Sequence, residues 1–202
     1  MNLDVYNIIT TVLEINCQSM DYNDPNYKNL VNLLRNTFVV GSQVIQDKID
    51  WPDDNDLDLF YYRHNKKKQR QEFNKLNNYI SVKSLDDCLD IDLLPILSAS
   101  NFYSNKEPDK SLTDCIFGSN KEIFTVSKGI IRMLNLKGFF LTKLASLSQR
   151  EEERDYKALT IVYEEFGNQL PEDVDNAINE YGLNNYFDEF KNNYLTSGEK
   201  SN

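Results

Sequence analysis

Apolar residues recur at intervals of three and four along most of the chain, which is the spacing of amphipathic helices. Asp24 and Pro25 supply an N-cap and a first-turn proline. Gly167 and Gly182 follow apolar stripes at positions that favour helix ends. The pattern predicts helices near residues 5–15, 25–38, 56–80, 84–94, 119–134, 136–147, 156–166, 171–181 and 187–194.

Two short stretches favour β structure, namely FVV at 38–40 and IFTV at 123–126. Each lies inside a helical pattern, so no strand pair is expected. No repeat of 20 to 50 residues is visible, which argues against a solenoid. The predicted fold class is therefore all-α, a compact and non-repetitive domain of about seven to nine helices.

One domain is expected over residues 1–196. The stretch SASNFYSNKEPDK, residues 98–110, is typical of a surface loop and marks a candidate sub-boundary. The last residues, 197–202, are expected to form a flexible tail.

The composition indicates a soluble intracellular protein, cytoplasmic or nuclear. The 202 residues include 22 Lys plus Arg and 32 Asp plus Glu, giving a net charge of −10. Asp4 and Glu14 make the N-terminal segment a poor signal peptide, and no apolar stretch approaches the length of a membrane span. Cys17, Cys88 and Cys115 are odd in number and widely spaced, as reduced thiols are.

Metal ligands are scarce. A single histidine and the lack of paired cysteines argue against zinc. Asp54, Asp56 and Asp58 have the spacing that begins a calcium loop, but Leu59 and Asn65 occupy its glycine and glutamate positions. We therefore interpret this segment as a solvated acidic turn, and predict no metal and no cofactor.

Catalytic patterns are equally sparse. The glycines are dispersed, without a phosphate-binding loop, and His64 has no evident nucleophile as partner. Glu152 with Asp155 and Glu172 with Asp175 share helix faces, but acids in a first turn are explained by the helix dipole. No catalytic residue is predicted, and the runner-up activity is that of a magnesium-dependent helical hydrolase.

A dense positive cluster stands out against the acidic background. Segment 60–83 carries seven basic residues and one acidic residue, net +6, which leaves −16 on the remainder. No apolar residue occurs between positions 64 and 72, so we expect the cluster to be exposed. Its members are the candidate partner-binding or targeting residues Arg63, Lys66, Lys67, Lys68 and Arg70.

Four interpretations of this basic cluster remain open. It can contact an acidic region of its own chain, either the DDNDLD run at 53–58 or the segment 151–202, whose net charge is −9. It can bind another protein that carries an acidic patch. The stretch KKQR, residues 67–70, also matches a loose nuclear import signal. Nucleic acid is less favoured, because the rest of the chain repels a polyanion.

The sequence therefore predicts a non-enzymatic protein-interaction module, a subunit, adaptor or regulator of an intracellular complex. Aromatic residues near the C-terminus add some support, because aromatic side chains are enriched at interfaces. A nucleic-acid-associated factor and an acidic inhibitor of the immunity-protein type are the alternatives. No contact with a membrane is expected.

Overall fold

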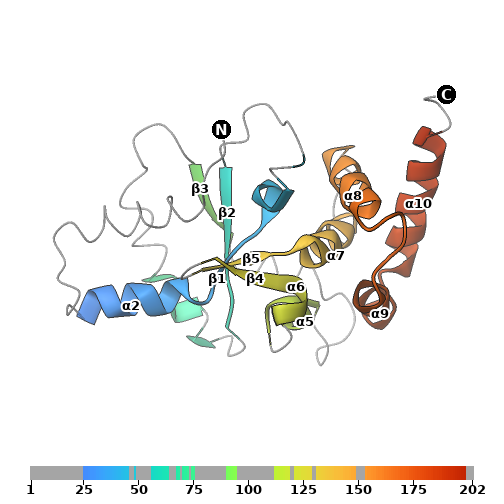
Figure 1. The fold of residues 1–202 in the computed structure, drawn as a ribbon. Helices are drawn as coiled ribbons and strands as arrows, with labels where there is room; N and C mark the ends of the chain where they lie inside the picture. The colour runs from blue at the N-terminus through green and yellow to red at the C-terminus, as the bar shows by residue number, and fades with distance from the viewer. Residues whose placement is uncertain are drawn as a thin grey trace. The chain divides into compact units, whose positions relative to one another are not determined.

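A computed structural model describes the placement of most residues after position 24. The described residues are 25–45, 48, 56–63, 67–68, 70–72, 74–75, 90–94, 112–118, 121–128, 131–148 and 153–198. The chain divides into two compact units (Figure 1). Unit 1 is Met1–Ile96 with Thr125–Leu134, and unit 2 is Leu97–Phe124 with Asn135–Asn202.

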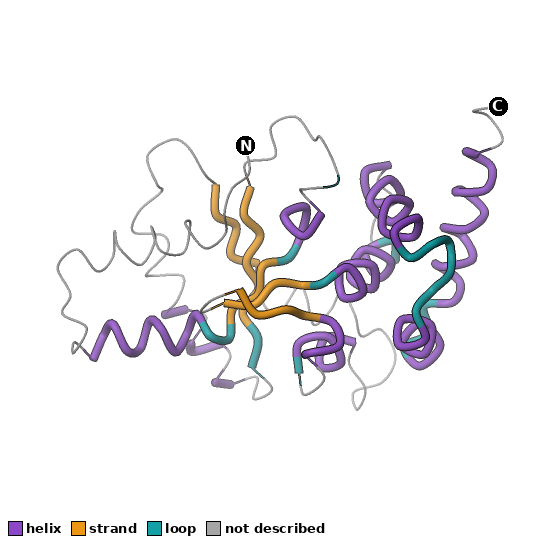
Figure 2. Tube along the Cα trace, viewed as in Figure 1, coloured by secondary structure: helices purple, strands orange, loops and turns teal. Residues whose placement is uncertain are grey.

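Unit 1 contains a mixed β-sheet, so the all-α prediction is wrong and the fold is α/β (Figure 2). In the described residues, five strands lie in the order β3-β2-β1-β5-β4. The β2–β3 and β1–β5 pairs are parallel, and the β1–β2 and β4–β5 pairs are antiparallel. The strands are β1 (Thr37–Val39), β2 (Asp56–Tyr61), β3 (Asp90–Leu94), β4 (Thr125–Lys128) and β5 (Ile131–Leu134).

Three of the predicted helices are wrong in part for the same reason. Strand β2 replaces the start of the 56–80 helix, β3 ends the 84–94 segment, and β4 and β5 lie in the second half of 119–134, after the short helix Lys121–Phe124. Short apolar runs do not distinguish a buried strand from a buried helix by period alone. The β-like stretches FVV and IFTV do enter β1 and β4, so their local preference was the better guide.

Helix α2 (Pro25–Leu34) and the short 3-10 helix η1 (Gly41–Ile45) flank strand β1 in the sequence. The helix begins at Pro25 as predicted, but it ends four residues before Phe38. All three residues of β1 are buried, as are Leu59 to Tyr62 at the end of β2. The core of unit 1 is thus built around the middle strands of the sheet.

Unit 2 is helical throughout its described residues. It contains α5 (Leu112–Phe117), α6 (Lys121–Phe124), α7 (Leu136–Ser146), α8 (Glu153–Glu165), α9 (Glu172–Glu180) and α10 (Asn184–Gly198). The last four correspond to the predicted helices 136–147, 156–166, 171–181 and 187–194, which are confirmed. Helix α10 continues two residues into the segment expected as a tail, and the predicted loop 98–110 lies outside the described residues.

Aromatic rings hold α7, α8 and α10 together around Phe140, which is fully buried. Its ring centroid lies 5.8 Å from that of Phe166, 6.0 Å from Phe190 and 6.3 Å from Phe187. Tilted and edge-on pairs at these separations are favourable beyond the area they bury. Much of the aromatic content near the C-terminus therefore serves packing.

A buried ion pair also joins α7 to α8. Lys143 Nζ lies 2.7 Å from Asp155 Oδ1, and the Asp155 side chain is completely inaccessible to solvent. Ser146 Oγ lies 3.5 Å from the other carboxylate oxygen. Asp155, a member of one predicted acidic pair, is thus compensated inside unit 2 rather than available to a metal ion.

We predict that Gly41→Ala destabilises unit 1 by about 3 kcal/mol. Gly41 has a φ of +75°, and a Cβ built there overlaps the Asp58 carboxylate, so the substitution adds overlap to backbone strain. Gly182→Ala is the control, because Gly182 also has a positive φ but a Cβ there meets open space. Strain alone predicts about 1 kcal/mol. Urea unfolding of both variants measures the difference, and equal losses would exclude the overlap.

Candidate functional sites

Strands β2 and β3 bring four acidic positions together on one face of the sheet. Their parallel register pairs Asp56 with Asp90 and Asp58 with Asp92. Residues two apart in a strand share a face, and paired residues of neighbouring strands share it too. These four positions therefore form one cluster, which we call the acidic face.

The acidic face is unfavourable by itself. Aspartate is depleted in strands, and like charges directly opposite each other on neighbouring strands are destabilising. The alternate positions of the same strands carry Leu57, Leu59, Ile91 and Leu93. The same register thus pairs apolar positions with apolar positions and acidic positions with acidic ones. Residues that disfavour their own secondary structure, such as aspartates in a strand, occur most often where a protein has a functional site.

The turn at Gly41 lies directly against the acidic face. Val40 N–H donates to the main-chain oxygen of Asp58 at 3.0 Å, which ties the end of β1 to β2. The Asp58 carboxylate then occupies the space where any other residue at position 41 would place its Cβ. Glycine is required here both for its positive φ and for this close approach.

Carboxylates in such a cluster are the ligands that Mg²⁺ prefers, usually one or two of them together with phosphate oxygens of a substrate. Among the side chains that the structure describes, no group of three or more Asp, Glu, His or Cys residues is placed to hold a metal. The side chain of Asp58 is in the described set, whereas Asp56, Asp90 and Asp92 are placed by backbone register.

The predicted acidic turn is wrong, because Asp56 and Asp58 both lie in β2. Asp54, the other residue of that motif, lies outside the described residues. The missed pattern is the alternation DLDL at 56–59 and its repeat DIDL at 90–93. A period of two, found twice, indicates two strands with acids on one face.

The basic cluster lies only partly within the described residues. Lys67, Lys68 and Arg70 are exposed on a helical stretch that includes residues 70–72 and 74–75. Arg63 lies just after β2 and is 40% exposed. Lys66 and His64 fall outside the described residues. The structure therefore confirms exposure for three of the predicted residues, and their use in binding stays a prediction.

Arg63 is bound within its own unit. Its Nε donates to Glu72 Oε2 at 2.9 Å and lies 3.3 Å from the Tyr61 hydroxyl, which also donates to Glu72. Burial and the hydrogen bond to Glu72 raise the pKa of Tyr61. Burial would raise the pKa of Glu72, but hydrogen bonds from Tyr61 and Arg63 lower it below the usual value. The acid that meets Arg63 is thus Glu72, which belongs to neither of the two acidic segments of the chain.

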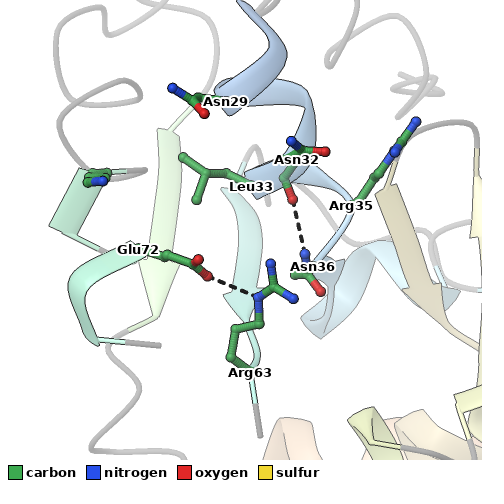
Figure 3. A pocket seen from close by; sticks show the side chains of 8 residues that line it. Asn29, Asn32, Leu33, Arg35, Asn36, Arg63 and Glu72 are labelled. Atoms are coloured by element: carbon green, nitrogen blue, oxygen red, sulfur yellow. Dashed lines mark hydrogen bonds and ion pairs between the residues drawn. The ribbon is translucent and has the colours of Figure 1, made fainter. Parts of the chain in front are cut away.

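A polar pocket of about 730 Å³ opens beside this group (Figure 3). Helix α2 and the turn after it contribute one wall, while Arg63 and the helical stretch after it contribute the other. Leu33 is the single apolar residue among the described residues that line the pocket. The others are Asn29, Asn32, Arg35, Asn36, Arg63, Glu72 and Lys75.

The remaining candidates offer little chemistry. Glu172 and Asp175 lie exposed in the first turn of α9, as the helix dipole favours. Cys115 is a free thiol, and burial raises its pKa, which disfavours the reactive thiolate. Cys17, Cys88 and the side chain of Glu152 lie outside the described residues.

Comparison of the chain with protein families, curated proteins and solved structures finds no match. Among the helices described here, none has both the length and the apolar character needed to cross a membrane. The function must therefore be inferred from the acidic face, the basic cluster and the pocket.

We predict that Glu72→Gln lowers the stability of unit 1 by about 1 kcal/mol at pH 7, because it removes a charged acceptor from Tyr61 and Arg63. The pKa of Glu72 is lowered on folding, so its contribution is full above the usual glutamate value and disappears as pH falls through the folded value. Urea unfolding from pH 7 to pH 3 measures both proteins. A difference in stability that does not decrease as pH falls from 7 would contradict this assignment.

Proposed function

We propose that unit 1 is a divalent-cation-dependent enzyme of phosphoryl transfer, with its site on the acidic face. The observation that carries the proposal is the register that pairs Asp56 with Asp90 and Asp58 with Asp92. Like charges opposite each other on neighbouring strands repel, and a divalent cation bound among them would lower that repulsion. Mg²⁺ in proteins is usually held by one or two carboxylates together with phosphate oxygens of a substrate, which suggests the substrate class.

The chemistry follows from the types of residue in the acidic face. A divalent cation held by carboxylates of the acidic face would polarise a phosphoryl oxygen of the substrate. The oxygen of a hydroxyl group or of water attacks phosphorus, and the bond from phosphorus to the leaving phosphate oxygen breaks. A carboxylate accepts the proton of the attacking group. The substrate class is a phosphoanhydride, of which a nucleoside triphosphate is the first to test.

The Gly41 turn supports the same site. It brings main-chain atoms within reach of the Asp58 carboxylate, leaving no room for a side chain between them. Glycine at such a place commonly allows a backbone to approach a ligand closely. A phosphate bound by a cation at Asp58 would therefore also meet the turn at Gly41 and Ser42.

Asp58→Asn is expected to lower cation-dependent stabilisation. In the native protein, Mg²⁺ or Mn²⁺ at a hundred times its dissociation constant adds about 2.7 kcal/mol to the unfolding free energy. The variant is expected to lose at least tenfold in cation affinity, and with it the cation-dependent turnover of α- and γ-labelled ATP. Glu153→Gln is the control, because that side chain is 90% exposed in unit 2. Calorimetry and product chromatography supply the measurements.

Asp92→Asn sharpens the same test. Removing one member of a like-charge pair is expected to stabilise the protein in EDTA while weakening cation binding. A variant that is more stable but binds the cation less tightly indicates a functional role for the residue, because a structural role predicts a loss of stability. A chain that ignores Mg²⁺ and Mn²⁺, with ATP present or absent, would exclude the proposal.

A second proposal retains the protein-interaction module. Its support is the exposure of Lys67, Lys68 and Arg70 on one helical stretch, in a chain that is acidic elsewhere. Opposite charges across an interface mainly increase the rate and selectivity of association. An acidic patch on another protein fits this surface, and KKQR as an import signal or a contact with nucleic acid would use the same residues.

Reversal of charge at Lys67, Lys68 and Arg70 to Glu is expected to remove a stoichiometric partner from the affinity-purified chain. The native complex is expected to weaken as salt rises from about 50 to about 500 mM, because these cations are exposed. Reversal at Lys157, which is exposed on α8, is the control. Recovery of nucleic acid in place of protein would favour the nucleic-acid alternative, and an unchanged complex would exclude this surface.

A further inference from the structure

The polar pocket between α2 and the helical stretch near Glu72 is a second site of unit 1, separate from the acidic face. Tyr61, whose hydroxyl joins Arg63 and Glu72, occupies an odd position of β2, whereas Asp58 occupies an even one. Odd and even positions of a strand point to opposite faces of a sheet. The pocket and the acidic face therefore lie on opposite sides of β2.

The lining of the pocket carries excess positive charge. Arg35, Arg63 and Lys75 contribute three positive charges and Glu72 one negative charge, so the described residues of the lining carry +2. A phosphate monoester carries about −1.5 to −2 at pH 7. One such group would balance the lining, and arginine is well suited to hold it through paired hydrogen bonds.

Several of these polar groups have unused hydrogen-bonding capacity. In the described part of the chain, the side chains of Arg35 and Lys75 make no hydrogen bond or ion pair. Arg63 uses only its Nε, for Glu72 and Tyr61, which leaves its terminal nitrogens for a ligand. Figure 3 shows this guanidinium projecting into the space between Glu72 and Asn36.

Tyr61 and Glu72 fix Arg63 in place before any ligand arrives. Glu72 accepts from both partners, and the Tyr61 hydroxyl comes from a residue that is fully buried. An arginine held in this way loses less conformational freedom on binding. Glu72 is thus a positioning residue, although its own charge faces the ligand.

The rest of the lining favours a hydrophilic molecule. The volume of about 730 Å³ lies within the range of small-molecule sites. Asn29 and Asn32 offer carboxamides, whose donors and acceptors suit hydroxyl groups, in place of the apolar walls found in most such sites. Leu33 offers one apolar contact.

We propose that this pocket binds a small hydrophilic phosphate monoester, whose phosphate is held by Arg35, Arg63 and Lys75 and whose hydroxyl groups meet Asn29 and Asn32. Binding at this site would need no metal ion, because the arginine and lysine side chains of the lining would contact the phosphate directly. It is independent of the catalysis proposed for the acidic face, so either can fail without the other.

Isothermal titration calorimetry of the full chain with ribose 5-phosphate in EDTA tests the site. Ribose and inorganic phosphate, which each contain one part of this probe, are titrated for comparison. Ribose 5-phosphate is expected to bind at least tenfold more tightly than inorganic phosphate, and ribose is expected not to bind. Arg35→Gln and Lys75→Gln are each expected to weaken binding at least fivefold. Lys67→Gln is the matched control, since that exposed cation is outside the lining.

Two further measurements distinguish binding in the pocket from binding at the acidic face and from nonspecific attraction between charges. Asp58→Asn is expected to leave the affinity for ribose 5-phosphate in EDTA unchanged, because that carboxylate lies on the other side of β2. Affinity is expected to fall below about pH 6, where the phosphate loses its second charge. If Lys67→Gln weakened binding of ribose 5-phosphate as much as Arg35→Gln and Lys75→Gln do, the binding would be a general attraction between charges and the pocket would be excluded. Failure of ribose 5-phosphate to bind would also overturn the proposal.

Discussion

The parallel register of β2 against β3 is the constraint on which the chemistry proposed for unit 1 depends. Leu57 and Leu59 alternate with aspartates on one strand, and Ile91 and Leu93 do so on the other. A shift by one residue would exchange the apolar and acidic positions between the two faces. The register that pairs these apolar positions therefore also places the acidic positions next to one another.

Helices α7 to α10 of unit 2 could be predicted well from the sequence, whereas the sheet of unit 1 could not, for physical reasons. Helices α7 to α10 have regular apolar spacing, and two of them are followed by glycines with positive φ, which are local properties. The sheet depends on contacts between segments far apart in the chain, because β1 pairs with β5, about 90 residues later. The spacing of apolar residues within one segment does not indicate which distant segment it pairs with. In β1 every residue is buried, which removes the polar alternation that identifies a strand.

The candidate sites follow the same division between local and distant information. The exposure of Lys67, Lys68 and Arg70 could be predicted, because a run without apolar residues has no face to bury. The repeated D-x-D alternation was visible, but only the register shows that the two copies are neighbours. The ion pair between Arg63 and Glu72 could not be predicted, because it joins residues nine positions apart and forms only when the chain turns back after β2.

The acidic face and the polar pocket lie on opposite sides of β2 and differ in charge. The net charge of the chain therefore does not decide which small ligands unit 1 can bind. A net charge of −10 argues against a polyanionic ligand at long range, yet it says little about a small ligand that meets a few charged groups at close quarters. At the acidic face a phosphate would require a divalent cation as intermediary, whereas in the pocket it would meet arginine and lysine directly. If both proposals hold, dependence on a divalent cation would distinguish the two faces of β2, because chelation would remove the intermediary from one and leave the other unchanged.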